Sequence, residues 1–135
     1  MEFLAAAEVF RHYVLISNEV NSPKVLTCPS DRSRQRTKSF ATFSNSNLSY
    51  FVGLDAVETA PQMRLSGDRN ITTNGRAFSG ILTLTSDMPV SWTKEIHNRS
   101  GNIGLADGSV EQVSETPREQ PRRSEIFSER LLIPY

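Results

Sequence analysis

Residues 101–113, GNIGLADGSVEQV, contain the strongest local indication of the fold. Asp107-Gly108 stands between apolar residues, and this dipeptide is typical of tight hairpin loops because both residue types tolerate a positive φ. A two-residue loop would place Leu105 opposite Val110 across the ladder. The stretch therefore predicts an antiparallel β-hairpin.

Further short strands are predicted on both sides of this hairpin. Runs of β-branched and aromatic residues between turn residues indicate strands at 48–54, 62–65, 81–85 and 90–92. Residues 24–27 also read as a short strand, and the polar residues 32–47 as an exposed loop. Residues 115–124 are predicted to be a loop or a frayed helix. The apolar residues in 126–134 predict a tail that docks back onto the domain.

Residues 3–19 form the best helical pattern. Phe3, Ala7, Phe10 and Val14 recur at helical spacing, and Pro23 ends the pattern. The apolar run at 14–16 predicts burial on more than one side. We therefore expect an α+β fold, with one N-terminal amphipathic helix packed on a mainly antiparallel sheet, in a single domain over residues 1–135.

Composition excludes several classes of protein. The 135 residues carry 15 Lys and Arg against 15 Asp and Glu, so the formal net charge is zero. Broad electrostatic binding of nucleic acid or anionic lipid needs a basic excess, which is missing here. A single cysteine excludes an intrachain disulfide framework and a thiolate-cluster metal site. No stretch reaches the roughly 18 consecutive apolar residues of a membrane span, so the chain as given is predicted to be a soluble domain.

Two sets of residues could carry catalysis. His97, followed after nine residues by Asp107-Gly108, could be an acid–base pair or two metal ligands, but the dipeptide already has a sufficient cause in the hairpin turn. The structural interpretation is favoured, with His97 bonded to nearby loop backbone. Cys28 could be a nucleophile paired with a histidine, but nothing in the sequence lowers its pKa, so a buried apolar role is favoured.

Two binding sites were weighed in the same way. Arg32, Arg34, Arg36 and Lys38 alternate with polar residues, as a phosphate-tracking strip would, but a solvated loop is favoured at zero net charge. No segment has the closely spaced acids of an EF-hand. A calcium site assembled from separate loops stays open, with oxygen donors from Asp55, Glu58, Asp68, Asp87 and Asp107.

Four segments in order resemble a known family. Residues 92–97 (WTKEIH), then nine residues and Asp107-Gly108, resemble the prepilin-type, processing-associated domain marked by His, nine residues and Asp-Gly. These are pilin-like proteins similar to type II secretion pseudopilins of planctomycete and verrucomicrobial bacteria. Residues 26–31 (LTCPSD), 48–55 (LSYFVGLD) and 66–70 (SGDRN) resemble the verrucomicrobial branch. The resemblance covers about residues 8–114.

The resemblance implies a structural role without catalysis and without a required cofactor. Its motif residues carry over as His97, Asp107 and Gly108, with a structural function. The implied partners are other pilin-like subunits and secreted cargo, contacted through loops 30–47 and 55–61, and not nucleic acid. Major pseudopilins often bind calcium in a C-terminal loop, but no matching acid cluster is present here, which leaves Asp107 as the single metal candidate.

The resemblance also bears on location. Such relatives begin with a leader and a long hydrophobic helix that anchors the subunit in the inner membrane, and the charged 3–19 segment does not match that helix. We expect the chain to correspond to the later, soluble part, either as a truncated head domain or as a shortened product. A parent with the anchor would lie in the cell envelope, with the membrane reached only through that helix.

Two alternatives compete with the structural role. One is a calcium- or metal-dependent extracytoplasmic binding module. The other is a small hydrolase that uses Cys28 or a serine with His97, which requires a pocket that brings these groups within about 3 Å.

Overall fold

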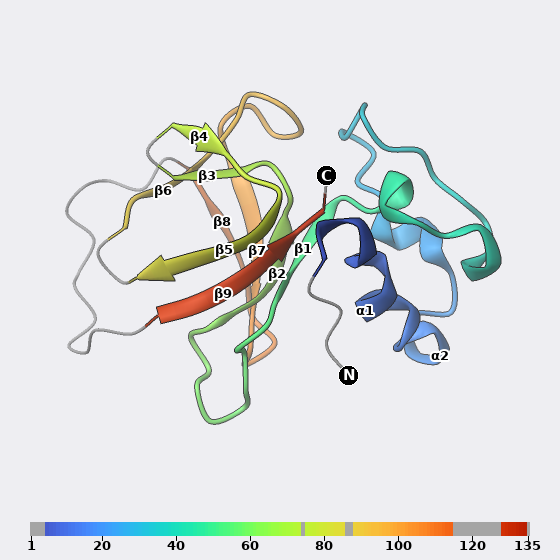
Figure 1. The fold of residues 1–135 in the computed structure, drawn as a ribbon, viewed down its shortest axis with the longest axis horizontal. Helices are drawn as coiled ribbons and strands as arrows, with labels where there is room; N and C mark the ends of the chain where they lie inside the picture. Colours follow the sequence, from blue (N-terminus) through green and yellow to red (C-terminus); the bar gives the residue numbers. More distant parts are fainter. Residues whose placement is uncertain (1–4, 74, 86–87, 115–127, 135) are drawn as a thin grey trace.

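The computed structural model describes residues 5–73, 75–85, 88–114 and 128–134 and shows a mixed helical and antiparallel sheet fold (Figure 1). The larger sheet has six strands in the order β5 (Gly80–Thr85), β9 (Ser128–Ile133), β1 (Tyr50–Gly53), β2 (Arg64–Asp68), β7 (Gly101–Leu105) and β8 (Val110–Val113). The smaller sheet has the order β4 (Arg76–Ala77), β3 (Ile71–Thr73) and β6 (Val90–Trp92). All strand pairs among the described residues are antiparallel, which confirms the sheet type expected from the sequence.

The main core lies between the two sheets. Phe51 of β1 and Ile103 of β7 point inward from the larger sheet, and Ile71 and Trp92 face them from the smaller sheet. All four side chains are at most 4% exposed. Because alternate residues of a strand point to opposite faces, each strand contributes every second residue to this core.

The N-terminal helical pattern is divided into short segments, so the prediction of one continuous helix was wrong. A 3₁₀ turn (Ala6–Glu8) precedes α1 (Phe10–Val14) and α2 (Ser17–Val20). The helix breaks at Ile16, whose φ and ψ of −106° and 22° lie outside the helical region. Leu15 and Ile16 are 68% and 44% exposed, which contradicts the predicted burial on more than one side.

Helical segments cover one part of the larger sheet and form a second core there. Val9 and Tyr13 pack with Phe43, Leu48 and Leu132 in a buried cluster. The Tyr13 hydroxyl donates to the Phe51 carbonyl at 2.8 Å and lies 2.8 Å from the Ser66 hydroxyl. The helical part is therefore attached to the sheet by both apolar contacts and buried hydrogen bonds.

β9 docks between β5 and β1, so the predicted docking of the tail is confirmed for residues 128–134. Leu131 and Ile133 enter the core between the sheets, while Leu132 enters the helical core. The residues 115–127, predicted as a loop or frayed helix and the beginning of the tail, lie outside the described residues.

Two local predictions failed next to the helical part. Residues 23–26 form a 3₁₀ helix (Pro23–Leu26) instead of a strand, because Ser22 caps it and Pro23 fits its first position. The predicted exposed loop 32–47 contains two 3₁₀ turns (Phe40–Thr42 and Asn45–Asn47). Asn45 is buried in it and both accepts from the Phe10 N–H and donates to the Ala6 carbonyl.

The 101–113 hairpin is present, but its register differs by one residue from the prediction. Gly104 pairs with Val110, and the Leu105 N–H donates to the Ser109 carbonyl at 2.9 Å. The loop therefore has three residues, with only Gly108 at a positive φ of 88°. The cause is the Asp107 carboxylate, which accepts from both the N–H and the hydroxyl of Ser109.

No helix within the described ranges is both long and apolar enough to span a bilayer.

Candidate functional site

The four segments that carry the family resemblance meet at one place in the structure. Cys28 lies in the turn that follows the Pro23–Leu26 helix, Asp68 ends β2, and His97 lies in the 93–100 segment between β6 and β7. The His97 Nε2 atom is 3.6 Å from Cys28 Sγ and 3.6 Å from Asp68 Oδ2. The Cys28 N–H donates to the Ser49 hydroxyl at 2.9 Å, which adds the residue before β1 to the cluster. We call these four residues the motif cluster.

The 93–100 segment has a strained backbone. Ile96, Asn98 and Arg99 have φ values of 65°, 50° and 67°. A β-branched residue such as Ile96 adopts this region only when its surroundings impose it. Asn70 supplies part of that constraint, because its side-chain amide donates to the carbonyls of Thr93 and Glu95. His97 is therefore held over the motif cluster by a fixed and strained loop.

A buried ion pair supports the cluster from the adjacent turn. The Arg69 guanidinium donates two hydrogen bonds to the Asp31 carboxylate, at 2.6 and 2.7 Å. The Asp31 and Arg69 side chains are only 1% and 12% exposed. Burial alone would raise the pKa of Asp31, but the hydrogen bonds and charge of Arg69 outweigh it and hold that pKa below its usual value. Arg69 also lies 3.6 Å from Glu95.

Asp68 is electrostatically the least satisfied member of the cluster. Its side chain is 1% exposed, Oδ2 accepts from the Asn102 N–H at 2.7 Å, and Oδ1 has no hydrogen-bond partner in the structure. Burial raises the pKa of Asp68, and the Asn102 hydrogen bond and the His97 charge offset only part of that effect. Burial, with the charges of Cys28 and Asp68, also raises the pKa of Tyr50 to about 12.

The cluster contains Cys, His and Asp but not the geometry of a catalytic relay. In a relay, one imidazole nitrogen serves the nucleophile while the other is held by the acid. Here Nε2 faces both Cys28 and Asp68, so one nitrogen would need to fill both roles. The hydrolase hypothesis correctly expected Cys28 and His97 to be neighbours, at 3.6 Å against the expected 3 Å.

His97 and Asp107, by contrast, are not brought together. They lie at opposite ends of β7, whose five residues span roughly 16 Å. The Asp107 N–H donates to the Pro61 carbonyl, and its carboxylate is engaged by Ser109, which lowers the pKa of Asp107. The predicted hydrogen bond of His97 to loop backbone holds for its main-chain N–H, which donates to Glu95, whereas its side chain faces the motif cluster.

The metal candidates are also dispersed. Asp55 pairs with Arg130 in a salt bridge of 2.7 Å, Asp68 lies in the motif cluster, and Asp107 lies in the hairpin turn. Asp87 falls outside the described residues. Within the part of the chain that the structure describes, no three His, Cys, Asp or Glu side chains, the motif cluster included, are grouped so that they could hold a metal ion.

The basic strip is not presented on one side. Arg34 turns inward, half-buried, and its Nε donates to the Leu48 carbonyl at 3.0 Å, while Arg32, Arg36 and Lys38 are exposed. The strip is therefore interrupted at its second cation.

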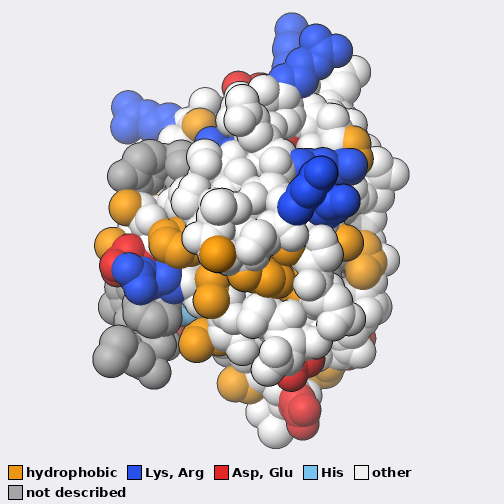
Figure 2. Space-filling view, turned by 90° about the vertical axis from the view of Figure 1, so that its right-hand side faces the viewer, with side chains coloured by type: hydrophobic (Ala, Val, Ile, Leu, Met, Phe, Trp, Pro, Cys, Tyr) orange, Lys and Arg blue, Asp and Glu red, His pale blue; other side chains and the backbone are white. Residues whose placement is uncertain are grey.

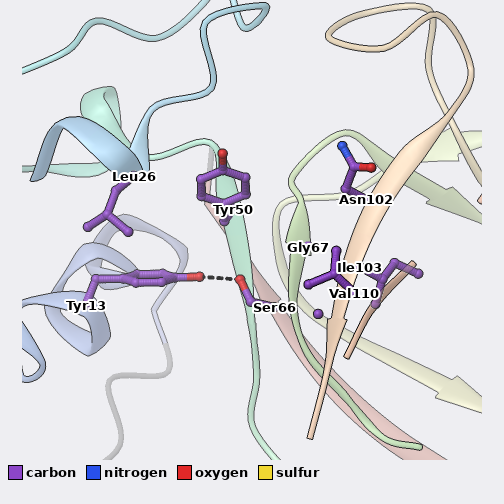
Figure 3. A pocket seen from close by; sticks show the side chains of 9 residues that line it. Tyr13, Leu26, Tyr50, Ser66, Gly67, Asn102, Ile103 and Val110 are labelled. Carbon is purple, nitrogen blue, oxygen red and sulfur yellow. Dashed lines mark hydrogen bonds between the residues drawn. The ribbon is translucent and has the colours of Figure 1, made fainter. Parts of the chain in front are cut away.

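A groove of about 230 Å³ opens beside the motif cluster, over the part of the larger sheet that the helical segments leave uncovered (Figure 3). Tyr13, Leu26 and Tyr50 form one wall, and Val110 stands on the opposite side. The floor is made of small residues of β2 and β7. The lining residues are Tyr13, Leu26, Tyr50, Ser66, Gly67, Asn102, Ile103, Gly104 and Val110. This lining contains no carboxylate, no basic group and neither Cys28 nor His97, so the groove suits an apolar group and offers no acid–base pair.

Sequence reasoning did not identify Asp68 as the partner of His97. Asp68 was considered only as one of five dispersed calcium ligands. The available signal was its place within the 66–70 segment of the family resemblance, whose members the structure brings together.

Comparison of the chain with protein-family models, with curated proteins and with solved structures yields no match.

Proposed function

We propose that this chain is the globular head of a structural subunit in a type II secretion pseudopilus or a related pilus-like fibre, and that it performs no catalysis. The observation that carries the proposal is the meeting of Cys28, Ser49, Asp68 and His97 in one cluster. These residues come from the segments that resemble the pilin-like family. Residues that define a fold are expected to pack together, and these do.

The chemistry of the cluster favours a structural role. His97 lacks the relay geometry, and Cys28 is only 6% exposed. The adjacent groove lacks acid and base side chains. Each motif residue instead has a structural effect: His97 fixes the entry to β7, and Asp107 and Gly108 form the turn that follows it.

An exposed apolar surface supports contacts with other subunits. Figure 2 shows the side of the molecule that bears the helical segments, where hydrophobic side chains form a band and Lys and Arg gather in separate groups. Leu15, Ile16 and Val25, which lie in or beside these segments, are 68%, 44% and 64% exposed. Large exposed apolar side chains that gather on one face are typical of protein–protein contact sites.

The first experiment concerns the protein in the cells that encode it. Its mass and N-terminal sequence would be determined together with its distribution between membrane, soluble and sheared surface fractions. A processed, membrane-associated form that also occurs in sheared fibres is the expected result. A soluble protein that begins at Met1 and is missing from both the membrane and the sheared fractions would overturn the proposal.

A second experiment tests the contact surface. Cys28→Ser removes the only thiol of the chain, so a single new cysteine can then report on contacts. We expect Val25→Cys in this background to form disulfide-linked dimers in fibre fractions under mild oxidation. Glu111→Cys, at an exposed position of β8, is the matched control. Equal cross-linking at both positions would show that the helical surface has no special role.

A further inference from the structure

The sole thiol of the chain lies beneath the strained 93–100 segment. Cys28 is 6% exposed, and the His97 ring lies against its sulfur at 3.6 Å. The His97 side chain is itself 25% exposed, so solvent protons reach it while the sulfur is covered. The backbone strain at Ile96, Asn98 and Arg99 favours release of the segment once its contacts weaken.

We propose that the 93–100 segment is a proton-dependent lid over Cys28, held closed by the contact between protonated His97 and Asp68. The proposal does not depend on the function given above. It rests on three observations: the 3.6 Å approach of His97 to Asp68, the burial of an unpartnered Asp68 oxygen, and the positive φ angles on both sides of His97.

The charged groups around Asp68 make His97 the relevant partner. Among the described residues whose charge acts on Asp68, His97 is the cation and Asp31 is an anion that opposes ionisation. Arg69 is occupied by Asp31 and lies near Glu95 of the lid. β1 contributes Tyr50, a neutral phenol, and β7 contributes the Asn102 N–H. Cys28 faces the same imidazole nitrogen from its own turn.

The direction of the effect follows from these charges. When His97 loses its proton, the ionised Asp68 is left buried without a cation, which is costly in a dry environment. Opening of the 93–100 segment admits water to Asp68 and removes that cost. The open fraction, and with it the accessibility of Cys28, therefore rises with pH across the range in which histidine titrates, about pH 5 to 8.

The test measures how fast Cys28 reacts with a disulfide reagent such as dithionitrobenzoate, in the intact protein and in the same protein unfolded by denaturant. The ratio of the two rates at each pH is the protection of the thiol, and it cancels the pH dependence of thiolate formation. Because the chain has one cysteine, every reacted sulfur is Cys28. We expect protection to fall roughly tenfold between about pH 5 and 8, the change given by one unit of pKa difference.

Matched variants separate the lid from general stability. His97→Gln should give low protection at every pH, and Asp68→Asn high protection at every pH, since each removes one charge of the pair. His12→Gln, which removes the only other histidine, should keep the wild-type pH dependence. Acrylamide quenching of Trp92, the single tryptophan, which is 4% exposed and next to the lid, gives a second reading in the unaltered protein.

Two results would overturn the proposal. One is a wild-type protection and Trp92 quenching that do not change with pH. The other is a folded His97→Gln protein that keeps the wild-type slope.

Discussion

The pair between Asp31 and Arg69 is the best place to test the packing of the motif cluster. Arg69→Met keeps much of the volume of the side chain and removes its charge and its two hydrogen bonds to Asp31. Asp31, with a side chain that is 1% exposed, would then be a buried carboxylate without a cation. Breaking a buried pair in this way typically costs about 3–5 kcal/mol. Since Arg69 is 12% exposed and water can partly replace it, we expect a loss near the lower end, about 3 kcal/mol.

The assay is urea unfolding followed by the fluorescence of Trp92, the only tryptophan of the chain. Asp31→Asn combined with Arg69→Met removes both charges, so the double variant should be more stable than the sum of the two single losses predicts by more than about 1 kcal/mol. A loss below about 1 kcal/mol for Arg69→Met, or full additivity in the double variant, would refute the reasoning.

The pH dependence of stability provides an independent check. The pKa of Asp31 is held below its unfolded value, so its contribution to stability is present above about pH 4 and is lost as the pH falls through the folded pKa. In Arg69→Met only burial acts, the folded pKa rises above the unfolded one, and the sign reverses. The stability gap between wild type and variant should therefore narrow on acidification. A gap of constant size would contradict this assignment of charges.

Three further predictions concern single features of the fold and use the same unfolding assay. Gly101→Ala should cost several kcal/mol, because a Cβ there would lie 2.0 Å from the Trp92 ring, whereas Gly104→Ala should be tolerated, with its nearest neighbour at 3.8 Å. Equal losses would show that the core relaxes around the new methyl group. Tyr13→Phe should cost about 1 kcal/mol, because the Phe51 carbonyl loses a buried donor, and an unchanged urea midpoint would be inconsistent with that bond. Calcium or a chelator should leave the melting temperature within about 1 °C, because the acids in the described ranges do not converge, and a rise that follows calcium concentration would favour the binding-module alternative.

The strands and the hairpin could be predicted because their signals are local. Alternating β-branched residues and the Asp107-Gly108 dipeptide act over a few neighbours, and β1, β5, β6, β7 and β8 lie where these signals place them. The continuous helix failed because apolar periodicity does not report where a chain turns, and Ile16 leaves the helical region. The central position of β9 depends on long-range pairing with β1 and β5, about which its own residues carry no information.

Burial of polar residues was the other limit of sequence reasoning. The 32–47 segment is polar in composition, yet Asn45 and Asn47 are each only 8% exposed. An asparagine amide can satisfy both a backbone donor and a backbone acceptor, so it is buried at low cost where such groups are present. Asn45 does this for Phe10 and Ala6. Such partners belong to a distant segment, and the same applies to Asp68, whose role depends on loops at 28 and 97 that the sequence does not place together.

The nine-residue spacing between His97 and Asp107 has a physical explanation that is independent of any chemistry between them. It is the length needed to enter, cross and leave β7: His97 fixes the entry through Asp68, and the turn at Asp107 is held by the Pro61 carbonyl. Between these points Ile103 must face the core. One inserted residue would turn Ile103 to the opposite face or detach one end of the strand, since the side-chain period of a strand is two. A spacing that is constrained at both ends and in the middle is expected of a structural motif, whereas a catalytic pair would constrain only the approach of its two side chains.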